Sequence, residues 1–228
     1  FIRLSFGPSL IIFSSILLGP FYGAIIGAGS DLLGSILFPS TLSGMSINPF
    51  ITIMYGLLGI LPWLIVFLTK YVRKAFNKPF IIYILVLAFW GLMLWFLLTH
   101  DSFSLYGGKV YQLSFGLKIS ILVISFALTI LMAFLLFLMN KSFKKKFTQN
   151  TNIPTPYEVS FVSFISEILI MLILGSIVKS IMYEIDFLFI FIVQVMMVFI
   201  DVPLNTFIAS YLLLLVNKIG MSNQSKGA

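Results

Sequence analysis

Residues 115–139 read FGLKISILVISFALTILMAFLLFLM and contain a single charged side chain, Lys118. A helix needs about 20 predominantly apolar residues to cross the roughly 30 Å hydrocarbon core of a bilayer, so this stretch can span it. Similar apolar runs recur along the chain, of which 60% is hydrophobic and 9% is charged. Soluble domains carry about 25% charged residues. The sequence therefore predicts an all-α, polytopic transmembrane helix bundle that forms one domain over residues 1–228.

The hydropathy pattern predicts seven membrane segments. They are Pro8–Leu18, Phe21–Phe38, Phe50–Thr69, Phe80–Thr99, Phe115–Met139, Glu158–Met182 and Phe187–Val216. The first is short for a full crossing, so it is either a tilted crossing or a re-entrant segment. In the second, Gly23, Gly27, Ser30 and Gly34 recur every three or four positions. This spacing predicts a face on which a neighbouring helix packs closely.

The positions of the lysine and arginine residues are consistent with this layout. Basic clusters follow the third, fifth and seventh segments, whereas residues 40–49 carry no charge. Because cytoplasmic loops are enriched in lysine and arginine, we expect the basic connections inside and the others outside a cell membrane. The net charge of +7 is then explained by these loops rather than by a nucleic-acid partner. Arg3 lies outside in this layout, and because the sequence opens at Phe1 without a methionine, we expect a further helix upstream.

Four ionisable residues lie inside apolar segments, namely Asp31, Glu167, Lys179 and Asp201. A charge at a helix centre costs about 2.5–3.5 kcal/mol on insertion scales, so such residues face the bundle interior or water. Asp31 either hydrogen-bonds across the glycine-rich face or contacts a substrate. Glu167 either pairs with a lysine or tyrosine or takes a functional role. We expect Lys179 to snorkel to the interface and Asp201 to cap a helix that restarts at the following proline.

The sequence contains no enzyme signature. It has no cysteine and a single histidine, His100, which excludes cysteine-based and multi-histidine metal sites. It also lacks the zinc-protease His-Glu-x-x-His motif, the G-x-S-x-G elbow and the Walker lysine motif. We therefore expect no catalysis, no cofactor and no metal. Asn205 is a candidate ligand contact, because an amide inside a helix bundle must find hydrogen-bond partners.

Several stretches resemble a known family. The run LLGPFYGAIIGAGSDLLG at residues 17–34 is preceded by RLSFG at 3–7 and followed by LFP at 37–39. Together these stretches resemble the folate-family substrate-binding (S) components of energy-coupling factor (ECF) vitamin transporters. The resemblance continues through NPFIT at 48–52 and YGLL at 55–58, and more weakly through DVPLNTFI at 201–208.

The resemblance implies a six-helix S component that binds a vitamin from outside. It would dock on a membrane scaffold subunit driven by two cytoplasmic ATPases. The S-component-like core would comprise residues 1–79 and 157–228 and would lack the family's first helix. Residues 80–140 would form an inserted helical pair, followed by a cytoplasmic linker at 141–156.

In such proteins three outer loops close over the ligand, and here they would be residues 3–7, 38–50 and 183–186. Arg3 would bind an anionic group of the substrate, because arginine suits bidentate contacts with such groups. The aromatic side chains of Phe6, Phe38, Phe50 and Tyr55 would stack against a flat ring of the substrate. The closing helix carries Gln194 where family members often have basic residues, which argues against folate as the substrate. The expected substrate-binding residues are Arg3, Phe6, Asp31, Phe38, Asn48, Phe50, Tyr55, Glu167 and Asn205.

Two other functions remain open at this stage. A stand-alone, ion-coupled secondary transporter would use Asp31, Glu167 or Asp201 as a proton or cation site, although the internal repeats typical of such carriers are not visible. A membrane scaffold or membrane enzyme is disfavoured by the missing catalytic clusters.

Overall fold

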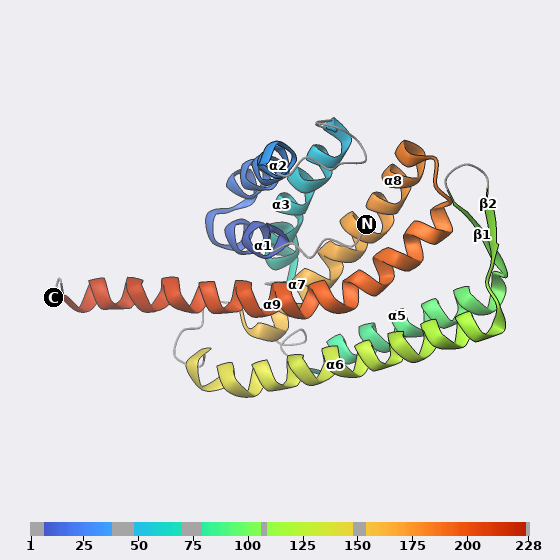
Figure 1. The fold of residues 1–228 in the computed structure, drawn as a ribbon. Helices are drawn as coiled ribbons and strands as arrows, with labels where there is room; N and C mark the ends of the chain where they lie inside the picture. The colour runs from blue at the N-terminus through green and yellow to red at the C-terminus, as the bar shows by residue number, and fades with distance from the viewer. Residues whose placement is uncertain (1–6, 38–47, 70–78, 106–108, 148–153, 227–228) are drawn as a thin grey trace.

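The computed structural model describes residues 7–37, 48–69, 79–105, 109–147 and 154–226 (Figure 1). Over these ranges the chain is helical apart from one short β-hairpin, so the predicted all-α bundle is confirmed. Five of the described helical segments are long and apolar enough to cross a membrane, which makes this a multi-pass membrane protein. Two further apolar segments are shorter, Gly7–Leu18 and Tyr83–Thr99.

Each of the seven predicted segments coincides with a helix, and the sixth is divided by a π-helical stretch, η2. The elements in chain order are α1 (Gly7–Leu18), α2 (Pro20–Leu37), α3 (Pro49–Thr69), α5 (Pro79–Thr99), β1 (Ser102–Leu105), β2 (Lys109–Gln112), α6 (Phe115–Phe147), α7 (Pro156–Ser166), η2 (Glu167–Leu174), α8 (Gly175–Tyr183) and α9 (Phe187–Lys226).

Helices α1 and α2 form a helical hairpin that turns at Gly19. This residue has a φ of +95°, a conformation that glycine adopts without steric cost. Pro20 then begins α2 at the first helical position, where a missing N–H is tolerated. The chain therefore folds back immediately, and the N-terminal end of α1 comes close to the C-terminal half of α2.

The glycine face of α2 packs directly on α3. A Cβ atom on Gly23 would collide with the carbonyl oxygen of Gly59, and one on Gly59 would collide with the carbonyl oxygen of Gly23. A Cβ on Gly27 would meet the carbonyl oxygen of Tyr55 in the same way. The predicted close-packing face is thus confirmed for Gly23 and Gly27. Gly34 is different, because nothing lies within 4 Å of the place its Cβ would take.

An aromatic and aliphatic cluster joins the α5–α6 pair to α7 and α9. The ring of Phe89 in α5 lies 5.6 Å from the rings of both Phe164 in α7 and Phe199 in α9, measured between centroids. All three side chains are buried. Figure 1 shows α5 and α6 running together on one side of α9, with α1–α3 on the other. The division of the chain into a core and an inserted pair stays a prediction.

The two ends of the bundle differ in charge, as the layout predicts. The β-hairpin and the turn between α8 and α9 lie at one end of the molecule, and the C-terminal ends of α6 and α9 lie at the other (Figure 1). The sequence places lysine clusters at both of these C-terminal ends. The basic ends of α6 and α9 are therefore on the same side of the bundle.

Two connections and the C-terminal end of α9 depart from the boundaries that the sequence predicts. The linker predicted at 141–156 begins as helix, because α6 continues to Phe147, and α9 continues past Val216 to Lys226. Polar side chains end the membrane-spanning part without ending the helix. The connection between the fourth and fifth predicted segments, residues 100–114, contains the antiparallel pair β1–β2, in which Ser102 lies opposite Gln112.

Helix α7 begins with a capping box. The Thr155 side chain accepts from the Glu158 backbone N–H, and the Glu158 carboxylate accepts from the backbone N–H of Thr155 at 2.7 Å.

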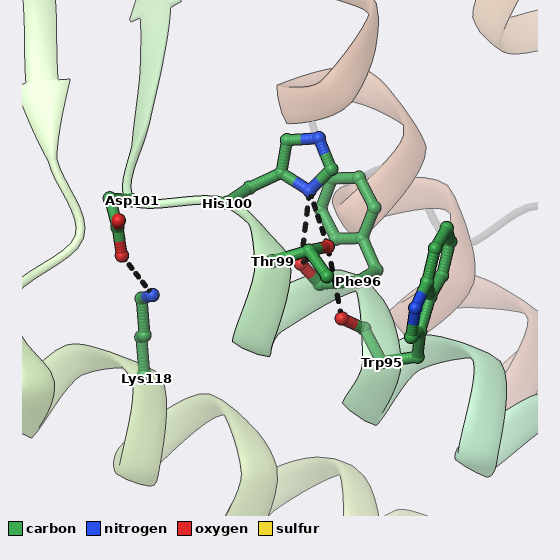
Figure 2. A network of polar contacts seen from close by, with 6 residues as sticks. All are labelled: Trp95, Phe96, Thr99, His100, Asp101 and Lys118. Carbon is green, nitrogen blue, oxygen red and sulfur yellow. Dashed lines mark hydrogen bonds and ion pairs between the residues drawn. The ribbon is translucent and has the colours of Figure 1, made fainter.

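The end of α5 carries a small polar network (Figure 2). Thr99 Oγ1 donates to the backbone oxygen of Trp95 at 3.0 Å, and the His100 ring stacks on Phe96 with centroids 4.5 Å apart. Beyond it, Lys118 Nζ on α6 donates to Asp101 Oδ1 at 2.6 Å. This contact ties the start of α6 to the end of α5. The hydrogen bond and the positive charge of Lys118 lower the pKa of Asp101 below its ordinary value of 3.8.

We expect Gly59→Ala to destabilise the protein by about 1–3 kcal/mol, because the added methyl group must push α2 and α3 apart. The control is Gly91→Ala in α5, where nothing lies within 4 Å of the new methyl group and no loss is expected. Thermal unfolding in detergent, followed by tryptophan fluorescence, measures both variants. Equal transition temperatures for the two would show that the α2–α3 contact is looser than described here.

We expect Lys118→Met to raise the pKa of Asp101 back towards 3.8, because both its hydrogen bond and its charge partner are lost. In the unchanged protein the stabilisation from this pair is present above pH 3.8 and is lost as the pH falls through the lowered pKa. Carboxyl ¹³C chemical shifts of Asp101, titrated in both proteins, provide the measurement. A midpoint that does not move between them would contradict the pairing.

Candidate functional site

A polar cavity of about 240 Å³ lies between α1, α2, α3, the η2–α8 segment and α9. All four ionisable residues that the sequence places inside apolar segments line this one cavity. The polar and charged side chains most relevant to its chemistry are Asp31, Tyr55, Glu167, Lys179, Gln194 and Asp201. The helices of this largely apolar bundle thus direct their charged side chains into the same cavity. This is expected, because a charged side chain that faces lipid has a high desolvation cost.

Asp31 is positioned by the close α2–α3 contact. Thr52 Oγ1 on α3 donates to Asp31 Oδ2 on α2 at 2.7 Å. Asp31 lies one turn beyond Gly27, whose backbone contact with Tyr55 brings the two helices together. The hydrogen bond across the glycine-rich face is therefore present, and Asp31 lines the cavity as well. A substrate contact of Asp31 stays a prediction.

Glu167 belongs to a buried hydrogen-bond chain that joins three helices. Ser9 Oγ on α1 donates to Asn205 Oδ1 on α9 at 2.6 Å, and Asn205 Nδ2 donates to Glu167 Oε1 at 2.8 Å. All three side chains are at most 2% exposed. The hydrogen-bond partner of Glu167 in the structure is thus the Asn205 amide, rather than the lysine or tyrosine that was one of the two alternatives for this residue. Asn205 makes the contacts that a buried amide needs, and it holds Glu167 against the cavity.

The π-helical stretch brings Lys179 to the same cavity as Glu167. In a regular α-helix, which turns about 100° per residue, side chains twelve positions apart point about 120° away from each other. The wider i→i+5 turns of Glu167–Leu174 take up this offset. Lys179 therefore lines the cavity and is partly buried. Its expected snorkelling to the membrane interface stays a prediction.

Asp201 does not cap a restarted helix, as the sequence suggested. Helix α9 runs unbroken from Phe187 to Lys226 with Pro203 inside it. Asp201 lies seven positions after Gln194, so the two share a helix face, and Met197 lies between them on that face. All three line the cavity.

The remaining predicted contacts divide into two groups. Asn48 Oδ1 accepts the backbone N–H of Phe50 at 2.9 Å and so supports the start of α3. Phe50 is 62% exposed. The described lining of the cavity includes Tyr55 but neither of these two residues. Arg3, Phe6 and Phe38 lie outside the described residues.

Lys179, Gln194 and Asp201 line the cavity but were not among the expected substrate-binding residues, although the sequence had marked Lys179 and Asp201 as charges inside apolar segments. The seven-residue spacing of Gln194 and Asp201 was a usable signal, because it places both on one face of a helix. Lys179 stands out as a charge inside an apolar segment, but its orientation towards the cavity depends on the π-helix and has no signal in the sequence. Over the described ranges, no group of three or more histidine, cysteine, aspartate or glutamate side chains could hold a metal ion.

Comparisons of this chain with protein-family models, with curated proteins and with solved structures found no match. Its function must therefore be inferred from the chemistry of the cavity and from the sequence patterns that surround it.

We expect Asn205→Leu to destabilise the bundle, since it removes the partner of both Ser9 and Glu167. A coupling energy of about 0.6–1.7 kcal/mol between positions 205 and 167 is expected from measured interhelical hydrogen bonds in membranes. A double-mutant cycle with Glu167→Leu measures it through unfolding in detergent. Glu167→Gln is the matched control, because its amide oxygen still accepts from Asn205. A coupling energy of zero would contradict the described contact.

Proposed function

We propose that this chain is a membrane-embedded substrate-binding subunit of an ECF-type, ATP-driven importer in the plasma membrane, and that the cavity binds a small vitamin-like molecule. The observation that carries the proposal is the polar cavity inside an otherwise apolar bundle. Charged residues at membrane depth are costly and are usually retained at substrate or ion pathways. A concave site with a few convergent polar groups is the usual form of a small-molecule site.

The stretches that resemble the S-component family meet around this cavity. Asp31 comes from the run at 17–34, Tyr55 from the run at 55–58 and Asp201 from the run at 201–208. These three residues lie far apart in the sequence and on three different helices. Their convergence on one cavity supports the idea that the resembling motifs serve a shared binding site.

The placement of the cavity also supports uptake from outside. Its lining begins at Gly7 and Pro8, at the start of α1, and includes residues of the second half of α2. These ends adjoin connections that the charge pattern predicts to be outside. By the resemblance, the partners would be a membrane scaffold subunit and two cytoplasmic ATPases, with lipid around the bundle.

A stand-alone ion-coupled transporter is the second candidate. It is favoured by one observation, that Asp31, Glu167 and Asp201 all line the same cavity as Lys179. Clusters of intramembrane acids also serve as proton relays and cation sites.

Native mass spectrometry of the gently purified, full-length protein is the first experiment. We expect a retained small molecule, with at least a tenfold loss of retention in Tyr55→Ala. The matched control is Tyr211→Ala, because Tyr211 is a tyrosine of α9 that is 50% exposed and outside the described cavity lining. A protein that retains nothing, even after incubation with B vitamins, would contradict the proposal.

Transport into proteoliposomes separates the two candidates. An ECF subunit moves substrate only together with its energising subunits and ATP. Uptake by the chain alone, driven by an ion gradient, would instead establish the secondary transporter.

A further inference from the structure

We infer that the cavity takes a compact organic cation, an inference that rests on the proposed substrate-binding function. The reason is the charge of its wall. The described lining holds three carboxylates, Asp31, Glu167 and Asp201, and one ammonium group, Lys179. Three negative charges and one positive charge leave a formal charge of −2. If one carboxyl retains a proton, the wall is still negative.

Two of the three carboxylates, Asp31 and Glu167, accept hydrogen bonds, and no carboxylate of the three forms an ion pair within the part of the chain that the structure describes. The donor to Asp31 is the hydroxyl of Thr52, and the donor to Glu167 is the amide of Asn205, both of which are uncharged. Lys179 is attracted electrostatically by both Glu167 and Asp201. Even so, among the described residues Lys179 makes no ion pair with any of these carboxylates. Within the described residues, no ion pair has to be broken before a ligand can bind these carboxylates.

Burial makes this charge count decisive for the sign of the ligand. Charges interact more strongly inside a bundle than in water, because the effective dielectric constant is far lower. An anionic ligand would add a further negative charge to a wall that already carries an excess. A cation instead supplies the counter-charge that the wall lacks, and burial costs less for a charge that is paired.

The grouping of the carboxylates within the described residues favours an organic cation over a metal ion. They come from α2, η2 and α9, and over the described residues no three acidic or histidine side chains converge closely enough to hold a metal. They surround about 240 Å³, which is slightly less than the roughly 300–1,000 Å³ of pockets for drug-sized ligands. A compact molecule that spans the space between separated carboxylates fits this arrangement.

The uncharged part of the wall suits a ring or an alkylated nitrogen. Tyr55, Met171 and Met197 also line the cavity. The face of an aromatic ring attracts cations by about 0.5–2 kcal/mol, and the flexible, polarisable side chain of methionine adapts to irregular shapes. The expected ligand therefore combines a positive charge with an apolar or heteroaromatic body.

The test is isothermal titration calorimetry on the purified full-length chain in detergent with ligands of different charge. Thiamine and choline are the cationic probes, riboflavin is the neutral one, and pantothenate and biotin are the anions. We expect a cationic probe to bind at least tenfold more tightly than any other. We also expect Asp201→Asn, which preserves the shape of the side chain, to weaken that binding about tenfold, and Lys179→Met to strengthen it.

The matched control is Asp101→Asn, since the Asp101 side chain is 91% exposed and lies on the α5–β1 connection, outside the described lining. Its affinity for the cation should be unchanged, and thermal unfolding confirms that each variant is folded. Tighter binding of an anionic or neutral probe, or an unchanged affinity in folded Asp201→Asn, would overturn the inference but leave the proposed function standing. Binding of none of the probes would overturn both.

Discussion

The organisation of this protein depends on one constraint: hydrocarbon offers no partner to a charged or polar side chain. The bundle carries Asp31, Glu167, Lys179 and Asp201 inside apolar segments, on the elements α2, η2, α8 and α9 in that order. Each is tolerated only where it meets other polar groups or water. Because all four line a single cavity, the helices that carry them must pack around it. The arrangement that keeps these charged side chains away from lipid also forms the polar cavity of the protein.

Two sets of contacts hold the wall of this cavity. On one side, the backbone contact of Gly23 with Gly59 lets α2 and α3 approach until Thr52 reaches Asp31. On the other, the hydrogen bonds from Ser9 to Asn205 and from Asn205 to Glu167 tie α1, α9 and η2 together. The contact between α2 and α3 requires glycine at both positions, because a side chain would keep the helices apart. The hydrogen-bond chain requires polar side chains whose donors and acceptors match. Helix α1 takes part in both regions, because Ser15 Oγ also accepts the backbone N–H of Trp63 on α3 at 3.1 Å. These contacts hold a helix of 12 residues in the bundle.

The sequence predicts the helices well because long apolar runs and a biased lysine distribution are strong, local signals. It also identifies every ionisable residue of the cavity, since such residues stand out in apolar segments. What it does not predict is how those side chains point. Pro203 suggests a broken helix, yet α9 runs through it because tertiary packing compensates for one missing backbone hydrogen bond. The β-hairpin did have a signal, the Gly107–Gly108 pair between two short polar–apolar stretches.

The π-helical stretch between Glu167 and Leu174 has a consequence for how this protein can change over time. Loss of one residue there would leave the hydropathy profile and the number of crossings as they are. In a regular helix each residue contributes about 100° of rotation and 1.5 Å of rise. The helical residues after the deletion would therefore rotate by about 100° and shift by about 1.5 Å relative to those before it. Lys179 would then leave the wall of the cavity, and a different side chain would take its place. A deletion of one codon would not show in a profile of membrane spans, yet it would be enough to change the charge that lines the cavity of a descendant of this chain.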